Sequence, residues 1–275
     1  MSRVKHFFRT YKPFTRAGVQ EMMTYRANFI CHFIGNILSA FIMYFVWQSV
    51  FLSSDSDTFM GFNMENMVVY LFITFLTDYM TYSDGAWTVG EEIKDGSIAM
   101  RMIRPCSFEM CFLFQELGTR IVCASIIFVP MVLGVEIYRF AVNGAVCFQI
   151  VNFLLYLLSM TIAYMISFYF NVCYGFMAFF FKNLWGTEII KDTLVSFLSG
   201  GLIPLAFLPS GLAAVLDVLP FASLRYTPVM IYMGMYSAGE IAWHIGLQLF
   251  WMLAMWGLSK LVWRSAVRHL TVQGG

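Results

Sequence analysis

Long apolar runs alternate with short polar segments along the whole chain. An α-helix needs about 20 mostly apolar residues to cross a bilayer, and six of the runs approach or exceed that length. They cover residues 28–51, 64–83, 117–137, 145–172, 193–208 and 242–263. The pattern predicts an all-α membrane protein in which residues 1–275 form a single transmembrane domain of six spans.

The composition supports the membrane assignment. Apolar residues make up 60% of the chain and charged residues only 12%, whereas a soluble domain carries about 25% charged residues. A soluble protein with a very large core is the alternative. It is disfavoured because too few polar side chains are present to cover a globule of this size.

Lys and Arg are distributed unevenly between the two sides of the predicted membrane domain. An even number of spans places both termini on one side, which then carries fifteen of the 17 Lys and Arg residues; the other side carries only Arg139 and Arg225. Cytoplasmic loops are enriched in Lys and Arg. We therefore expect a multi-pass protein of the cell inner (cytoplasmic) membrane, with both termini and residues 90–105 in the cytoplasm.

Residues 1–27 are basic and amphipathic. Val4, Phe7, Phe8 and Tyr11 have the i, i+3, i+4, i+7 spacing of one helical face. This spacing predicts a helix that lies in the cytoplasmic interface, in contact with membrane lipids, before the first span. A merely basic tail is the alternative.

Glycine and proline interrupt the apolar sequence before the last span. Gly200-Gly201 is followed by four prolines, at positions 204, 209, 220 and 228. Proline breaks helices, and unpaired backbone groups are costly in lipid. Residues 209–235 are therefore predicted to form short half-helices that dip in from the outside, one of them at about residues 210–219. A pair of kinked spans is the alternative and would raise the count to eight.

Residues 90–105 form the most strongly charged segment in the interior of the chain. The residues expected to contact a soluble partner are Glu91, Glu92, Asp95, Gly96, Arg101 and Arg104. The apolar residues between them suit a short helix along a surface. The rule that cytoplasmic loops are basic explains the Lys and Arg residues here but not the carboxylates, which contribute little to topology. We expect a docking helix that receives force from a soluble partner, with an ordinary solvated loop as the alternative.

Motifs for catalysis and nucleotide binding are missing from the sequence. It contains no G-x-x-x-x-G-K-[ST], H-E-x-x-H or G-x-S-x-G. Its four histidines and six cysteines are scattered, so we predict neither a metal site nor a disulfide framework. The chain is predicted not to be an enzyme and to have no nucleic-acid partner.

Few ionisable residues lie at predicted membrane depth. The candidates are Asp78, Glu116, Arg120, Glu188 and Asp192. Glu116 and Arg120 have the i, i+4 spacing that allows pairing on one helical face. Ionisable groups within a membrane are candidates for moving substrate or protons, although ion pairing and helix packing also explain them. The sequence places no charge clearly in the middle of a span.

Together these features resemble the permease subunit of a type-2 ABC exporter, in the branch described as ABC-2 family transporter proteins. The resemblance rests on the interfacial helix, the six spans, the charged segment ending in Arg104-Pro105, and the outer segments around residues 207–210, 218–221, 227–228 and 234. It implies that residues 90–105 correspond to a coupling helix. It also implies a second permease, identical or related, and separate ABC ATPase subunits that bind ATP and Mg, with no cofactor bound by this chain.

The resemblance also implies a substrate path between two permeases, lined by the first, second and fifth spans. The aromatic candidates on these spans are Phe33, Phe41, Phe72, Phe75 and Phe197. An adaptable apolar lining suits a hydrophobic or amphipathic substrate such as a drug, peptide or lipid, although each aromatic residue could equally face lipid or pack between helices. The alternative function is a secondary transporter or channel that works without an ATPase, which would need a mid-membrane charge or a polar stripe.

Overall fold

The computed structural model describes residues 3–53, 58–103, 106–181 and 184–267, and these residues contain helices but no β-strand. The α-helices are α1 (Arg3–Thr24), α2 (Arg26–Leu52), α3 (Met64–Thr81), α4 (Gly85–Lys94), α5 (Ile98–Met102), α6 (Phe108–Cys123), α7 (Val129–Asn143), α8 (Ile150–Gly175), α9 (Trp185–Leu198), α10 (Ser210–Val218), α11 (Tyr226–Met233) and α12 (Ala238–Val267). The predicted all-α class is confirmed.

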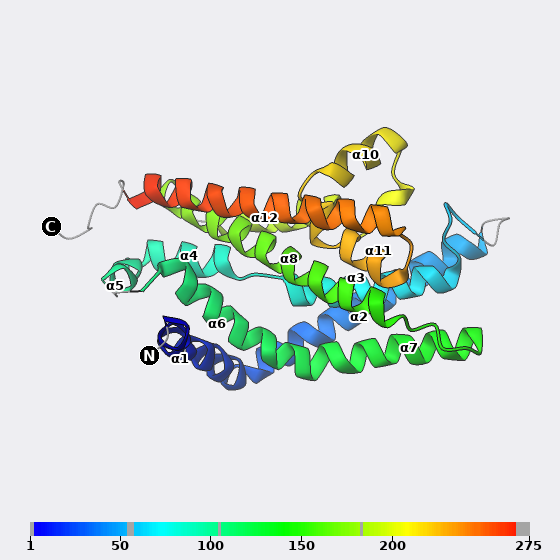
Figure 1. Ribbon diagram of the computed structural model, residues 1–275, viewed down its shortest axis with the longest axis horizontal. Coiled ribbons are helices and arrows are strands. Elements are labelled where there is room, and N and C mark those ends of the chain that lie inside the picture. The colour runs from blue at the N-terminus through cyan, green and yellow to red at the C-terminus, as the bar shows by residue number, and fades with distance from the viewer. Residues whose placement is uncertain (1–2, 54–57, 104–105, 182–183, 268–275) are drawn as a thin grey trace.

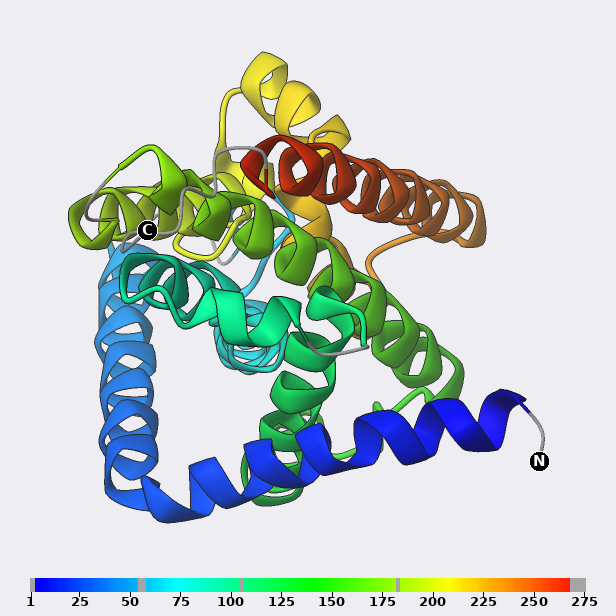
Figure 2. The same ribbon diagram turned by 90° about the vertical axis from the view of Figure 1, so that its left-hand side faces the viewer.

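The long helices run together along one axis, and the charged segment lies at one end of the bundle (Figure 1). Helices α1, α4 and α5 and the C-terminal end of α12 all lie at this end, which we call the inner end. Viewed along the bundle, α1 lies across the inner end rather than parallel to the other helices (Figure 2). An interfacial helix requires this orientation. The assignment of the inner end to the cytoplasm remains a prediction from the Lys and Arg distribution.

Four helices in the described part of the chain are long and apolar enough to cross a membrane. They cover Phe29–Leu52, Phe108–Asn143, Ile150–Phe179 and Ala238–Ser265. Helix α3 has 18 residues that include Glu65 and Asp78, and α9 has only 14 residues, so neither meets the same measure. A multi-pass helical membrane protein is therefore shown, while the six-span topology remains a prediction.

The predicted third span, residues 117–137, lies within a longer helix. Helices α6 and α7 are joined by a π-helical turn at Ala124–Phe128, so helical structure continues from residue 108 to residue 143. Pro130 has no backbone N–H to donate, and the wider turn just before it accommodates the missing bond. The helix ends at Gly144, whose φ of +66° suits glycine at a C-terminal cap.

The predicted bounds of the fifth span, residues 193–208, were wrong at both ends. Helix α9 begins at Trp185 and therefore includes Glu188 and Lys191, which precede the predicted span. Lys191 donates a hydrogen bond of 2.6 Å to Asn171 of α8. The helix ends at Leu198, because Gly200 turns the chain with a φ of +79°. The Tyr70 hydroxyl of α3 fixes this turn by donating to the Gly200 carbonyl at 2.6 Å.

Between α9 and α12 the chain forms two short helices. Helix α10 has nine residues and is mostly exposed, and α11 has eight residues and is almost entirely buried against α3 and α8. A bilayer-spanning helix needs about 20 residues. These lengths exclude the pair of full-length kinked spans, and the predicted short helices are present, although their depth in the membrane remains a prediction.

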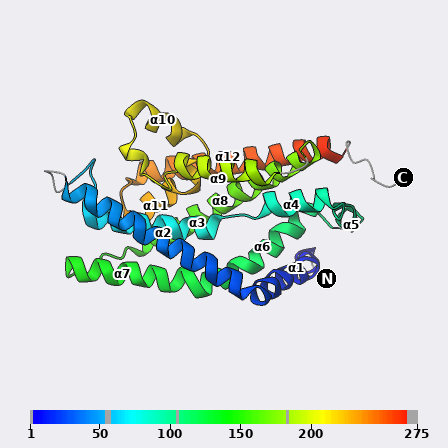
Figure 3. The same cartoon turned by 180° about the vertical axis from the view of Figure 1, so that it is seen from behind.

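Helix α3 lies at the centre of the bundle, whereas α2 and α9 lie on its surface. Helix α3 packs against α2, α7, α8 and α11, and its residues Met67, Tyr70 and Ile73 are fully buried. The Thr77 hydroxyl also forms a buried hydrogen bond of 3.0 Å with Tyr156 of α8. By contrast α9 has no buried residue, and Figure 3 shows α9 on the same face as α2.

Candidate functional site

The charged segment folds as a helix, a turn and a second helix, so the prediction of one helix over residues 90–105 was wrong. Its first part is the second half of α4, which begins at Gly85, and its second part is α5. Gly96 lies between the helices with a φ of +78°, a conformation that glycine adopts readily. The turn is also fixed by Asp95, whose Oδ1 accepts a hydrogen bond of 2.8 Å from the backbone N–H of Ser97.

Two of the residues predicted to contact a partner hold the segment together internally. Oε1 of Glu92 in α4 accepts hydrogen bonds from Nε of Arg101 in α5 at 2.7 Å and from its Nη2 at 2.6 Å. The Arg101 guanidinium also lies 4.1 Å from the ring centre of Phe112 in α6. Both partners of the ion pair are largely buried. The predicted contact residue Arg104 and the neighbouring Pro105 lie outside the described residues.

The outward surface of the segment combines charged and apolar side chains. Glu91 forms an exposed ion pair of 3.2 Å with Lys94, and Asp95 is also exposed. Three large apolar side chains of the segment are also exposed: Trp87, Met100 and Ile103, with exposed fractions of 47%, 63% and 74%. Reasoning from the sequence identified the charged residues but did not separate exposed from buried apolar ones.

Glycines bring the backbone of α4 into direct contact with the inner end of α8. A Cβ atom at Gly175 would lie 2.8 Å from Cβ of Val89 and 2.9 Å from the carbonyl oxygen of Gly85. These distances leave no room for a side chain. A displacement of α4 would therefore move α8, which it contacts directly, and α3, which precedes it in the chain.

Glu116 and Arg120 of α6 hold the junction between α3 and α4, but they do not pair with each other as their spacing allowed. Arg120 donates a hydrogen bond of 2.8 Å to the Tyr79 carbonyl and a second one to the Tyr82 carbonyl, and so caps the C-terminal end of α3.

Glu116 joins three elements at the same junction. It accepts hydrogen bonds from the hydroxyls of Ser83, at 2.9 Å, and Tyr164, at 3.0 Å. Since Ser83 lies between α3 and α4 and Tyr164 is on α8, both α6 residues have a structural role here.

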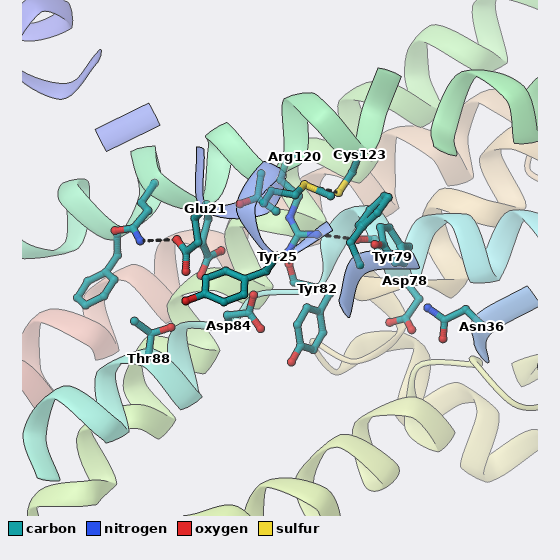
Figure 4. Close-up of a pocket in the computed structure, with 16 residues that line it drawn as sticks. Glu21, Tyr25, Asn36, Asp78, Tyr79, Tyr82, Asp84, Thr88, Arg120 and Cys123 are labelled. Atoms are coloured by element: carbon teal, nitrogen blue, oxygen red, sulfur yellow. Dashed lines mark hydrogen bonds between the residues drawn. The ribbon is translucent and has the colours of Figure 1, made fainter. Parts of the chain in front are cut away.

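A cavity of about 540 Å³ lies beside this junction, near the inner end of the bundle (Figure 4). We call it the inner cavity. Helices α1, α2, α3, α4 and α6 and the residues that join them contribute its lining: Glu21, Met22, Tyr25, Phe29, Asn36, Asp78, Tyr79, Tyr82, Asp84, Thr88, Phe112, Gln115, Glu116, Thr119, Arg120 and Cys123. The sequence singled out Asp78, Glu116 and Arg120, and the fold brings all three to this cavity. It did not indicate Glu21 or Asp84, because both lie in segments assigned to the cytoplasmic surface.

Arg225 was predicted to lie on the outer side, and the structure corrects this. Its guanidinium forms an ion pair with Asp78, which lies roughly 21 Å along the axis from the outer end of α3, at 1.5 Å per residue. Gly201 leaves room for the Arg225 side chain, since a Cβ there would lie 2.5 Å from Nη1. The bundle therefore contains a charged pair well inside its length, which the sequence pattern did not show because Pro and Gly surround Arg225.

The remaining predicted polar residues, Glu188 and Asp192, do not reach the inner cavity. Both lie on α9 beside Lys191, whose Nζ is 3.0 Å from Asp192 and 3.9 Å from Glu188. Lys191 also lies 4.9 Å from the ring centre of Tyr174 in α8. These contacts attach the first turns of α9 to α8.

The five predicted path residues are partly buried or exposed and lie on α2, α3 and α9. Phe33 and Phe72 pack against the core, and Phe72 meets the ring of Phe41 edge-on at 6.1 Å. Phe75 is half-buried on α3, and Phe197 on α9 is 36% exposed. A path between two permeases remains a prediction.

The bundle, its apolar helices and its charged inner end define a multi-pass α-helical membrane protein. The chain belongs to the ABC-2 family of transporter proteins, since residues 37–274 match the family model described as ABC-2 family transporter protein. A search of curated proteins found no match. Membership confirms the resemblance drawn from the sequence and makes the chain a transport permease of a family that generally works with ABC ATPase partners.

Proposed function

We propose that the protein is the membrane subunit of an ATP-driven exporter and that α4 and α5 form the docking surface for a separate ATPase. ATP and Mg would be bound by that ATPase, and the substrate would be a hydrophobic or amphipathic compound exported across the cytoplasmic membrane. The observation that supports this best is the construction of the charged segment. It exposes Trp87, Met100 and Ile103 while its own backbone is packed rigidly on α8.

The mixture of exposed side chains favours a protein partner over a solvated loop. A loop that only satisfies topology needs Lys and Arg, but it has no need of exposed aromatic and aliphatic side chains next to carboxylates. Aromatic residues and Met are enriched at protein interfaces, with polar residues around them. Trp87 beside Glu91 and Lys94 has this composition.

The internal contacts of the segment suit the transmission of force. The Glu92–Arg101 pair makes α4 and α5 move together. The close contact at Gly175 makes α8 move with α4. The hydrogen bonds of Arg120 connect the neighbouring end of α3 to α6. Closure of a docked ATPase would therefore move α3, α6 and α8 together, and not only the two spans adjoining the segment.

A second permease fits the face formed by α2 and α9. Apolar side chains on α2, such as Leu38, Phe41 and Phe45, are exposed, and α9 has no buried residue. The family resemblance implies a pair of permeases, and we propose that they meet on this face.

The Glu92–Arg101 pair offers a direct test. In a purified complex of permease and ATPase, Glu92→Lys should lower substrate-stimulated ATP hydrolysis by about tenfold, because two cations would then face each other and separate α4 from α5. Combining Glu92→Arg with Arg101→Glu restores an ion pair and should recover most of the activity. Glu65→Gln, at the outer end of α3, is the matched control and should behave as the unaltered protein.

Two outcomes would contradict the proposal. One is normal coupling by an assembled complex that carries Glu92→Lys. The other is full transport by the permease reconstituted alone, which would favour a secondary transporter or channel; the Asp78–Arg225 pair is the mid-bundle charge that such a protein needs.

A further inference from the structure

We propose that the inner cavity binds an amphipathic organic cation that reaches it from the inner membrane leaflet. The inference rests on the proposed export function in treating this cation as the substrate, and it adds the charge that the substrate carries. Three observations support it: the size and aromatic lining of the cavity, its excess of carboxylates, and its place between the interfacial helix and the docking segment.

The cavity has the dimensions and the apolar walls of a small-molecule site. Its volume of about 540 Å³ lies within the range of roughly 300–1,000 Å³ typical of ligand pockets. Tyr25, Phe29, Tyr79 and Tyr82 line it with aromatic rings. Such rings bind an apolar body and also attract a cation over their faces, most strongly where water is excluded.

The polar side chains of the lining give it an excess of negative charge. Four carboxylates, those of Glu21, Asp78, Asp84 and Glu116, share the lining with a single Lys or Arg residue, Arg120. The guanidinium of Arg120 is directed at the carbonyls of Tyr79 and Tyr82.

Cations outside the lining compensate only part of this charge. Asp78 is paired with Arg225, which is not part of the lining. Glu21 accepts a hydrogen bond of 3.0 Å from the neutral amide of Gln115, and the ion pairs among the described residues include neither Glu21 nor Asp84. A cationic ligand would compensate these two carboxylates, a neutral one would leave them unchanged, and an anion would be repelled.

The position of the cavity links it to the membrane surface and to the docking segment. Glu21 and Tyr25 lie where α1, across the inner end, meets α2. An amphipathic cation at the level of the inner headgroups would therefore meet these residues first. The wall also includes Thr88 of α4 and Asp84 just before it. Any movement of α4 under a docked ATPase changes the shape of this wall, so ligand binding and ATP hydrolysis would be coupled.

A pair of probes of equal shape and opposite charge tests the inference. The unaltered permease in lipid nanodiscs should bind tetraphenylphosphonium saturably in equilibrium dialysis, after subtraction of binding to empty nanodiscs, and should not bind tetraphenylborate saturably. The double substitution Glu21→Gln and Asp84→Asn should raise the Kd for tetraphenylphosphonium about tenfold or more. Glu65→Gln, outside the cavity, should leave it unchanged.

A second measurement places the bound probe without altering any carboxylate. A cysteine introduced by Thr88→Cys should react with N-ethylmaleimide, as read by mass spectrometry of its peptide, and tetraphenylphosphonium should slow this reaction at least fivefold. Equal binding of the two ions, an unchanged Kd in the double variant, or absence of protection at position 88 would each overturn the inference.

Neither measurement needs the ATPase, so the two proposals can fail separately. If the cation does not bind but Glu92→Lys still lowers substrate-stimulated ATP hydrolysis, only the inference about the cavity is overturned. If the cation binds but Glu92→Lys leaves substrate-stimulated ATP hydrolysis unchanged, only the docking function of α4 and α5 is overturned.

Discussion

The two ends of the bundle differ in how closely helix backbones approach one another. At the inner end, helix backbones meet at glycines: a Cβ at Gly18 of α1 would lie 2.0 Å from the carbonyl oxygen of Gln115 in α6, and one at Gly118 of α6 would lie 2.1 Å from that of Thr15 in α1. Toward the outer end, side chains bridge the helices. Tyr70 bonds to the Gly200 carbonyl at 2.6 Å and Trp251 to the Val218 carbonyl at 2.8 Å.

This difference has a mechanical consequence. A backbone contact has one geometry, because no side chain lies between the helices to change its rotamer. A side-chain hydrogen bond or ion pair can exchange partners while the backbones move apart. The inner end therefore suits the transmission of displacement from a docked ATPase, and the outer end suits rearrangement during release of a substrate.

The largest expected effect comes from breaking the α1–α6 crossing. Gly118→Val places a branched side chain where even a Cβ would lie 2.1 Å from Thr15. The helices must separate, and we expect a loss of about 3 kcal/mol or more, the upper range for overpacking. Unfolding in mixed detergent micelles measures it.

Gly134→Val is the matched control, because Gly134 lies on the same continuous helix with no atom within 4 Å of an added Cβ. Its free energy of unfolding should change by less than about 1 kcal/mol. Equal losses in the two variants would show that helix propensity, and not backbone contact, sets the stability of the inner end.

A smaller effect is expected from the Asp78–Arg225 pair, a side-chain contact between helices. Arg225 is mostly buried, but Asp78 is 41% exposed, so water screens part of their attraction. In a double-mutant cycle with Asp78→Asn and Arg225→Gln, we expect a coupling energy of about 1 kcal/mol. Unfolding in the same detergent system measures it, with the exposed Glu91–Lys94 pair as the comparison cycle, expected near zero.

A coupling energy for Asp78 and Arg225 that approached the cost of Gly118→Val would contradict the division between fixed backbone contacts and exchangeable side-chain contacts. A value indistinguishable from that of the Glu91–Lys94 cycle would show that the buried pair does not hold α11 to α3.

The elements that depend on local pattern could be predicted from the sequence. The amphipathic spacing in residues 1–27 indicated α1, and the prolines after Gly200 indicated short helices in place of full spans. The charges of residues 90–105 indicated a surface segment, and the family resemblance drawn from these features is confirmed by the match over residues 37–274.

The features that depend on tertiary contact could not be predicted. Lys191 donates a hydrogen bond to Asn171 of α8, and Glu116 accepts hydrogen bonds from Ser83 and Tyr164. The inner cavity combines residues from segments that are up to about 100 positions apart. Neither hydrophobic periodicity nor charge counting carries information about such distant partners.

The smallest expected effect concerns the turn between α4 and α5, where the Asp95 side chain fixes the backbone at Ser97. The hydrogen bonds from Ser97 lower the pKa of Asp95 below its usual value. A lowered pKa means that the carboxylate stabilises the turn at neutral pH and that this contribution is lost as the pH falls below about 4. The protection factor of the Ser97 amide, its hydrogen-exchange rate relative to the intrinsic rate at the same pH, should therefore fall at low pH in the unaltered protein. In Asp95→Asn, whose amide oxygen still accepts a hydrogen bond but does not titrate, the protection factor should not change with pH; the same fall in this variant would show that the turn depends on Gly96 alone.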